Sequence, residues 1–344
     1  MLATCALVPS SEAGTPGMVT GTDLHAQALL QRAVLAENST VYQGVELISV
    51  AGDAAGTSGS PAATADTTEI VTITHLPGQG TVLVENATDG TPQRAAFSPA
   101  DSGADSARPN LLLGLLDRSY QLTLGTFGLV AGRHARQVVA RREDGSVAAR
   151  FWIDAVTGLL LRRDLLSRDG RLVRRTEFVQ LTLAAANPRH LPAMLPVISG
   201  NTMSDRDLNT WIGRGWPCPR VLGGLSLFDA RSEPGDRGPV LHLTFSDGLS
   251  TVSVFVQSGR LDLSGLGATS VATVGGQQVR VRSGVPRGLV WSSQGFVITV
   301  VADAPADTVA AVVAALPHTQ GADGGWARVR RGLARVVSWL NPFT

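Results

Sequence analysis

The sequence contains no lysine: all 29 basic residues are arginine, against 28 aspartates and glutamates. A Walker A phosphate loop requires a lysine, and Schiff-base or pyridoxal enzymes require an amine nucleophile, so these enzyme classes are excluded. The net charge of +1 argues against a protein that coats nucleic acid, because that role needs a broad positive field. We therefore expect no nucleic-acid partner.

Long apolar runs and catalytic motifs are also missing. The longest apolar stretches, such as 297–302, are far shorter than the roughly 18 residues of a membrane-spanning helix. The six histidines are dispersed, and there is no HExxH, paired CxxC, GxSxG or GxGxxG motif. The acidic residues form no carboxylate-plus-histidine run typical of a hydrolytic metal site. We predict a protein that is not an enzyme, with no catalytic residue, metal site or cofactor.

Only two cysteines are present, Cys5 and Cys218, and they lie far apart in the sequence. Three interpretations are open. Both thiols are unpaired, or one disulfide ties the N-terminus to the second half of the chain in an oxidising compartment. The third is lipidation of Cys5, which follows Leu2-Ala3-Thr4 in a lipobox-like context. Residues 1–21, rich in Ser, Thr, Gly and Pro, are expected to be a flexible lead-in or the remnant of a signal segment.

The first half of the chain predicts two helices and an antiparallel meander. Apolar residues at three- and four-residue spacing predict a helix over 24–35, and a shorter one is expected over 109–116. Low-complexity sequence predicts a disordered hairpin tip over 51–66. Alternating, β-branched sequence between turn signals predicts strands at 41–50, 68–75, 81–86, 120–124, 134–141, 148–154, 159–166 and 172–183. Such a meander can curve around the first helix.

A proline-rich linker over 186–202 is expected to separate this region, 22–185, from a second domain over 203–318. In the second domain a helix is predicted over 307–316, between two prolines. Strands are predicted at 225–230, 240–246, 250–257, 269–274, 277–282, 288–293 and 295–301. The predicted fold class is α+β, mostly antiparallel β, with a terminal helix in the second domain.

Positive charge gathers in residues 133–175, which hold eleven arginines and five acidic residues. The densest points flank the Asp169-Gly170 turn, at Arg162, Arg163, Arg171, Arg174 and Arg175. One interpretation is the solvated face of a strand pair with cross-strand ion pairs. The other is a binding surface for an acidic peptide or an anionic lipid headgroup, because guanidinium groups suit carboxylate and phosphate.

The C-terminal tail, 319–344, is basic and amphipathic. Its apolar residues share one face of a helical wheel, opposite most of its arginines. The tail is expected to pack on its own domain, to lie in a membrane interface, or to dock into a groove of a partner. The residues that would make the membrane or partner contact are Trp326, Arg328, Arg330, Arg331, Leu333, Arg335 and Trp339.

Several short motifs resemble a known family, the RseB/MucB regulators of extracytoplasmic-stress (sigma-E) sigma factors. The resemblance covers most of residues 23–316 in the expected order. In the first domain it rests on the motifs at 41–44 and 120–122, and most strongly on the run 130–154 followed by 157–166, 169–171 and 177–178. In the second domain it rests on those at 240–243, 246–256, 275–279 and 303–316.

This resemblance implies an N-terminal open half-barrel wrapped on helices, similar to the LolA/LolB-like lipoprotein carriers, and a smaller antiparallel β domain. It implies binding without catalysis. Such a protein holds the outer segment of a membrane-anchored anti-sigma factor, shields it from proteolysis, and releases it when a lipidic ligand binds. The implied location is extracytoplasmic, in the periplasm or on the envelope side of the membrane. The alternative function is a lipid or lipoprotein carrier of the cell envelope.

Overall fold

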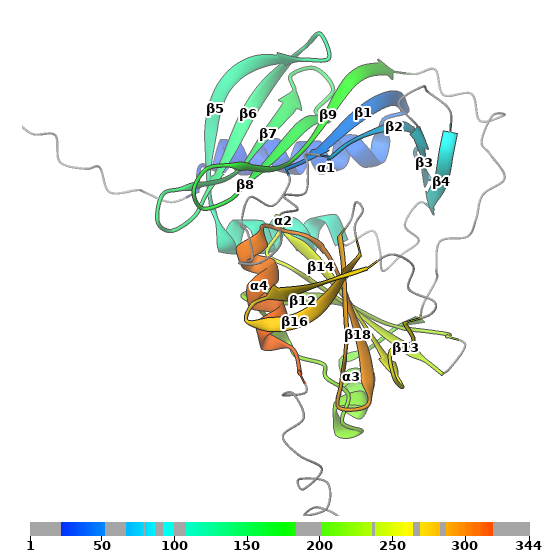
Figure 1. The fold of residues 1–344 in the computed structure, drawn as a ribbon. Coiled ribbons are helices and arrows are strands. Elements are labelled where there is room, and N and C mark those ends of the chain that lie inside the picture. Colours follow the sequence, from blue (N-terminus) through cyan, green and yellow to red (C-terminus); the bar gives the residue numbers. More distant parts are fainter. Residues whose placement is uncertain are drawn as a thin grey trace, which may run out of the picture.

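The computed structural model describes residues 22–51, 67–78, 80–86, 92–99, 108–183, 201–235, 238–263, 269–282 and 287–318. In this part of the chain, four helices and eighteen strands form two antiparallel sheets, one above the other in Figure 1. No helix in the described ranges is both long and apolar enough to span a membrane. The predicted α+β class, mostly antiparallel β, is confirmed.

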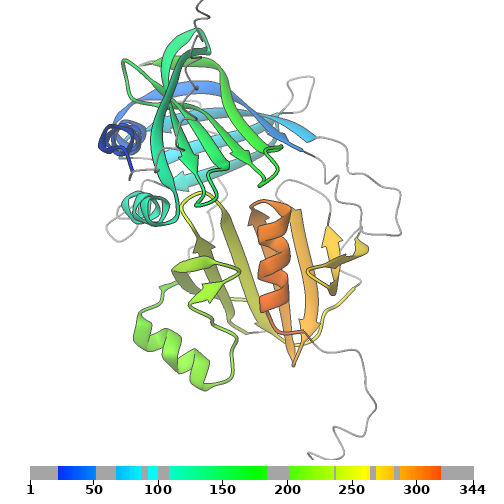
Figure 2. The ribbon, with the colours of Figure 1, turned by 90° about the vertical axis from the view of Figure 1, so that its left-hand side faces the viewer.

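The N-terminal sheet has nine strands in the order β4-β3-β2-β1-β9-β8-β7-β6-β5, so the first and last strands of the region meet in its centre. The sheet is open and curves over α1 (Figures 1 and 2). Its strands are β1 (Tyr42–Val50), β2 (Thr67–Leu76), β3 (Gly80–Asn86), β4 (Pro92–Pro99), β5 (Gln121–Val130), β6 (Arg133–Arg141), β7 (Val147–Asp154), β8 (Leu160–Leu166) and β9 (Leu172–Leu183).

Helix α1 (Leu24–Ser39) lies on the concave face of this sheet. It begins at Asp23, whose carboxylate accepts a hydrogen bond from the backbone amide of His25 at 2.8 Å. A single stripe of the helix is buried, and three of its four members are alanines: Ala26, Leu30, Ala33 and Ala36. Small side chains let the helix axis approach the strands closely. Helix α2 (Arg108–Ser119) follows β4 and packs beside α1.

The first of the short sequence motifs, Val41–Gly44, has a packing role at the sheet centre. Tyr42 stacks on His75 of β2, with ring centroids 5.1 Å apart, and meets the edge of Phe178 on β9. A Cβ atom on Gly44 would lie 2.7 Å from the Phe178 ring and from the Gln180 carbonyl oxygen. Glycine at position 44 therefore leaves the space that the phenylalanine ring occupies.

The C-terminal sheet has the order β10-β12-β13-β14-β18-β17-β16-β15, and β11 pairs with β12. Its core is built from alternate valines and leucines of the central strands together with α4. The strands are β10 (Asn201–Thr202), β11 (Val221–Leu222), β12 (Leu225–Glu233), β13 (Val240–Ser246), β14 (Thr251–Ser258), β15 (Ser270–Val274), β16 (Gln277–Arg282), β17 (Arg287–Ser293) and β18 (Phe296–Asp303).

Helix α4 (Ala306–Ala315) covers one face of this sheet, where Val312 and Val313 are fully buried (Figure 2). The predicted terminal helix at 307–316 is thereby confirmed. Helix α3 (Asp205–Gly213) begins with a capping box in which Ser204 and Asp207 bond each other's backbone amides. It buries only Leu208 fully and was not predicted, because one buried residue in nine produces no apolar periodicity.

The strands of both sheets lie where alternation in the sequence predicted them, with four exceptions. β4, β10 and β11 were not predicted, and β5 continues six residues beyond the predicted 120–124 segment. β4, β5 and β10 are edge strands, and β10 and β11 have only two residues each, so their alternating pattern is weak or too short to recognise. The lead-in (1–21), the low-complexity segment (52–66), most of the proline-rich linker (184–200) and the tail (319–344) lie outside the described residues. Expectations about them, and the domain limits they define, stay predictions.

Candidate functional site

The predicted arginine surface lies on the β8–β9 hairpin, but the structure divides it between the two faces of the sheet. Successive side chains of a strand point to opposite faces, so neighbouring arginines separate. Arg162 and Arg175 lie on the convex face with Asp164. Arg163 and Arg174 lie on the concave face and point toward the C-terminal sheet. The five predicted residues therefore do not form one continuous surface.

On the convex face, Asp164 receives two guanidinium groups. Arg162 donates to both carboxylate oxygens at 3.0 and 2.7 Å, and Arg175 does so at 2.8 and 3.0 Å. Asp164 is only 3% exposed. Burial by itself would raise the pKa of its carboxyl group, but the hydrogen bonds from the two arginines outweigh burial and lower it. Arg162 also stacks on Trp152, with its guanidinium carbon 4.1 Å from the ring centroid.

On the concave face, the other two arginines join the sheets to each other. Arg174 lies 3.2 Å and Arg163 3.9 Å from carboxylate oxygens of Asp303, the last residue of β18. Arg163 also donates to the backbone carbonyl of Leu249, in the β13–β14 turn. Both guanidinium groups therefore have partners within the chain, at the junction of the two sheets.

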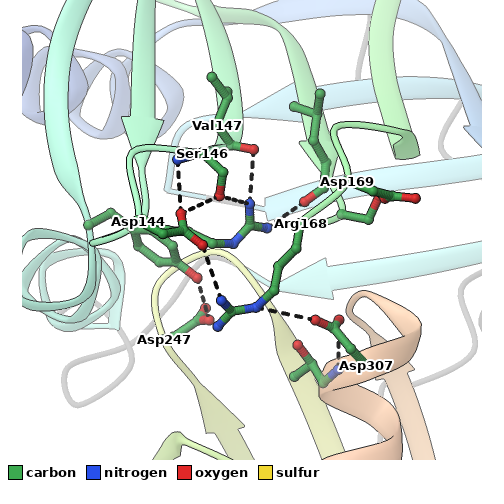
Figure 3. Close-up of polar contacts among 12 residues, drawn as sticks. Asp144, Ser146, Val147, Arg168, Asp169, Asp247 and Asp307 are labelled. Carbon is green, nitrogen blue, oxygen red and sulfur yellow. Dashed lines mark hydrogen bonds and ion pairs between the residues drawn. The ribbon is translucent and has the colours of Figure 1, made fainter.

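Arg171 is the most exposed of the predicted group, with 61% of its side chain accessible, and it pairs with Asp169 at 2.6 Å. Its neighbour Arg168, which was not singled out by sequence, bridges the sheets. It lies 3.2 Å from Asp144 in the β6–β7 turn and 3.6 Å from Asp307 in the first turn of α4, as Figure 3 shows.

A cleft of about 390 Å³ lies along this junction. Its N-terminal wall includes Arg142, whose guanidinium donates to the carbonyls of Val147 and Leu166 at 3.0 and 2.6 Å. Its C-terminal wall includes Asp247 and Asp307. The cleft is mainly polar and carries charges of both signs, which fits a junction held by ion pairs.

The β13–β14 turn enters the N-terminal core from the other side of the junction. The hydroxyl of Tyr120 donates to the Asp247 carboxylate at 2.6 Å. The side chain of Leu249 is 2% exposed and belongs to the apolar cluster formed by α1, α2 and the N-terminal strands. Sequence reasoning placed Tyr120 and 246–256 in separate family motifs, and the structure brings these motifs into contact.

A second group of carboxylates faces the concave side near the centre of the sheet. Glu46 is on the same face of β1 as Tyr42 and Ile48, which pack in the core. Burial, together with the charge of Glu37 on α1, raises the pKa of Glu46 to about 7, although Arg174 opposes the shift. Burial also raises the pKa of Glu37, near the C-terminal end of α1.

A smaller cavity, about 190 Å³, lies between α1 and α2. Leu30, Leu113 and Leu122 supply its apolar lining, and glutamine and asparagine side chains lie at its rim. Gln31 and Asn110 are exposed, so the cavity is partly open to solvent, and its volume is large enough for a short apolar group.

One polar cluster of the C-terminal sheet was not anticipated. His242 forms hydrogen bonds through Nδ1 to the Glu233 carboxylate at 2.9 Å and through Nε2 to the Ser253 hydroxyl at 3.2 Å. Its ring stacks on Phe255. The order of acid, histidine and serine is that of a catalytic triad. Ser253 lies in the middle of a strand paired on both sides, so nearby amides are held in the sheet and are not free to form an oxyanion hole.

The remaining predictions meet the following structural facts. Cys218 is a buried free thiol whose pKa is raised to about 11 by burial, and Cys5 lies outside the described ranges. Among the residues that the structure describes, no three His, Cys, Asp or Glu side chains are grouped to hold a metal ion. The seven tail residues predicted to contact a membrane or partner also lie outside those ranges.

Comparison with known proteins places both sheets in one family. The MucB/RseB N-terminal domain matches residues 25–196, and the MucB/RseB C-terminal domain matches residues 213–317. In sequence the chain is similar to the sigma factor AlgU regulatory protein MucB of Pseudomonas aeruginosa. Identity is 31% over 184 residues, which make up 49% of this chain and 57% of that protein.

The fold of this chain is similar to that of the solved structure of MucB. The crystal structure of MucB covers 87% of this chain and 100% of its own, with a TM-score of 0.52 and 20% identity. MucB in complex with MucA(peri) covers 86% of this chain and 100% of its own, with a TM-score of 0.49 and 22% identity. The match to the curated relative spans little more than half of that protein's length. Because the two domain matches lie in order and together cover both sheets, the chain belongs to the MucB/RseB family.

Proposed function

We propose that this protein is a non-enzymatic regulator on the extracytoplasmic side of the membrane that binds the outer segment of a membrane-anchored anti-sigma factor. The observation that carries the proposal is the match of both family domains, in order, over the two sheets. A relative is named as a sigma factor regulatory protein, and MucB has been crystallised with MucA(peri). Binding would shield the segment from site-selective proteolysis.

Three residues of the predicted arginine group are suited to a direct role in this binding. Arg162 and Arg175 lie on the convex face, where no helix covers the described sheet, and Arg171 extends from the hairpin tip. Arg163 and Arg174 are engaged by Asp303, so their substitution would disturb the junction of the sheets instead. We propose the convex face of the β8–β9 hairpin as a contact for acidic residues of the anti-sigma segment.

The test is titration calorimetry of the full chain with the purified outer segment of a single-pass anti-sigma protein from the same source, followed by protease digestion of the complex. We expect micromolar or tighter binding and slower cleavage of the segment. A folded protein that neither binds nor protects it would refute the function.

Charge reversal tests the proposed contact surface independently of the proposed regulatory function. Arg171→Glu, which reverses the most exposed charge of the group and leaves the ion pairs of Asp164 in place, should weaken binding and its salt dependence. The matched control is Arg214→Glu, a charge reversal on the exposed end of α3, far from the hairpin. Equal affinities for the two variants would retain the regulator and refute this contact surface.

We further propose that a lipidic ligand weakens this binding, which the open concave sheet and the cavity between α1 and α2 favour. Vesicles of phosphatidylglycerol, added to the complex, should raise the dissociation constant. The alternative function, a lipid or lipoprotein carrier, rests on the same concave face. It predicts lipid transfer between donor and acceptor vesicles in the absence of any protein partner, which the regulator does not require.

A further inference from the structure

The β13–β14 turn is inserted into the other half of the molecule. Its tip, Asp247-Gly248-Leu249, leaves the C-terminal sheet and packs beside α2 of the N-terminal region. Leu249 is 2% exposed, and the apolar residues around it, including Leu30, Leu116 and Leu122, all come from the N-terminal region. A leucine of one sheet thus completes the core of the other.

The turn is shaped before it docks. The Asp247 carboxylate accepts hydrogen bonds from the amides of Leu249 and Ser250 at 2.9 and 2.7 Å. The Ser246 hydroxyl donates to the Ser250 carbonyl at 2.7 Å and accepts from the Gly248 amide at 2.9 Å. These bonds are local to the turn, so Leu249 is presented as a rigid projection and little chain entropy is lost on docking.

The site on α2 that receives the turn requires glycine at position 248. Gly248 has φ +91°, and a Cβ atom there would lie 2.4–2.6 Å from the backbone and Cβ of Leu116. The backbone of the turn is therefore in direct contact with the backbone of α2. Tyr120, just after α2, fastens the turn by its 2.6 Å hydrogen bond to Asp247, and Arg163 holds the Leu249 carbonyl.

The same helix forms the wall of the cavity between α1 and α2. Asn110, Leu113 and Gly114 line that cavity, whereas Leu116 contacts the turn. Leu30 and Leu122 belong both to the cavity lining and to the cluster around Leu249. A group that widens the gap between α1 and α2 and displaces α2 also disturbs its contact with the turn, because close-packed interiors transmit such displacements.

From these contacts we propose that the β13–β14 turn is an interdomain latch, a contact between the two halves of the molecule in which Leu249 is the central buried side chain. Filling the cavity between α1 and α2 breaks this contact. The latch fixes the orientation of the two sheets. By thermodynamic reciprocity, a latch opened by mutation must make the cavity easier to fill. The proposal concerns this chain alone and stands or falls independently of any sigma-factor partner.

The first experiment tests the latch on the full chain by small-angle X-ray scattering and by hydrogen exchange of peptides covering 113–122 and 246–250. Gly248→Ala should raise the radius of gyration and speed exchange at least tenfold in both segments. Gly276→Ala is the matched control, since Gly276 also has positive φ (+77°) but an added Cβ would meet nothing within 4 Å. Leu249→Ala provides a second latch variant that leaves the backbone of the turn unchanged. If both latch variants scatter and exchange like the control, the latch is refuted.

The second experiment tests the coupling without an added ligand. A Cβ on Gly114 would meet only the Arg118 guanidinium, at 3.6 Å, so Gly114→Ala is tolerated and leaves the cavity open. Gly114→Trp fills the cavity and should reproduce the scattering and exchange of Gly248→Ala. Conversely, 1-hexanol, a probe small enough for the cavity, should bind Gly248→Ala several-fold more tightly than the wild type. If Gly114→Trp scatters and exchanges like the wild type, and hexanol binds Gly248→Ala and the wild type equally, the coupling between cavity and latch is refuted. The latch itself is not affected by that result.

Discussion

The two faces of the N-terminal sheet shift the pKa of a carboxyl group in opposite directions. On the convex face Asp164 is enclosed by Arg162 and Arg175, and its pKa is lowered. On the concave face Glu46 has another carboxylate, Glu37, as its nearest strong influence apart from burial, and its pKa is raised to about 7. Burial raises the pKa of both carboxyl groups, and only for Asp164 do the hydrogen bonds and charges of two arginines outweigh it.

The largest effect is expected from removing the convex carboxylate. Asp164→Ala leaves two partly buried guanidinium groups with no shared anion, so we expect the free energy of unfolding to fall by about 3 kcal/mol. Urea denaturation measures this loss. Asp169→Ala is the control, because Asp169 is paired with Arg171 at an exposed turn. A similar loss in both variants would show that enclosure of Asp164 is not what stabilises this face.

The concave carboxylate predicts a pH dependence of the opposite sign. Because the folded state raises the pKa of Glu46 from 4.5 to about 7, it holds the proton more tightly than the unfolded state does. Stability is therefore highest below pH 4.5 for this group and falls as the pH rises to 7, by up to about 3 kcal/mol. Glu46→Gln should remove this slope and be more stable than the wild type at pH 8.

Asp164 sharpens the contrast in the same pH series. Its folded-state pKa is lowered, so its contribution is complete above the usual value of 3.8 and is lost as the pH falls through the folded pKa. The two carboxylates thus act in separate pH windows. Denaturation curves from pH 2 to 8 for Asp164→Asn and Glu46→Gln test the assignment, and a slope near neutral pH that survives in Glu46→Gln would contradict it.

A smaller effect is expected from one arginine of the convex face. Arg162→Ala removes the stack on Trp152 and two hydrogen bonds to Asp164, but Arg175 remains. We expect a loss of about 1–2 kcal/mol in the free energy of unfolding. Arg162→Lys keeps the charge and loses the planar group, so an intermediate stability would separate stacking from charge.

The smallest effect is expected at the tip of the hairpin. Arg171 is mostly exposed, and its pair with Asp169 is screened by water and salt. Arg171→Ala should leave the midpoint of thermal unfolding unchanged within error. A clear drop would place Arg171 in the supporting structure of the convex face and weaken its assignment as a partner contact.

Much of the fold followed from periodicity. The core strands of both sheets and helices α1 and α4 were predicted because each buries a regular set of apolar residues, such as Ala26, Leu30 and Ala33 on α1. Helix α3 and strand β4 were missed, because α3 depends on its cap and β4 is an edge strand. An apolar periodicity in the sequence reflects a regularly buried face, and α3, which buries only Leu208 fully, shows no such periodicity.

The sequence identified the arginines of the candidate site but not the residues that pair with them. The arginines of β8 and β9 stood out as a charge cluster, but their separation onto two faces depends on strand register. Asp303 and Asp307, which receive Arg174 and Arg168, lie about 130 residues further along the chain, and no local signal connects them. Tyr120 and Asp247 were each noted in a motif, yet their contact was not predictable.

The sequence by itself determined which lysine-dependent enzyme classes are excluded, the strand-rich architecture and the family, because composition, periodicity and motifs are local properties. The tertiary structure decided which charges meet. It turned one basic cluster into a convex ion-paired face and a junction between two sheets, and it set Leu249 of one sheet in the core of the other. These pairings depend on register and on the docking of segments far apart in the chain, which local sequence does not encode.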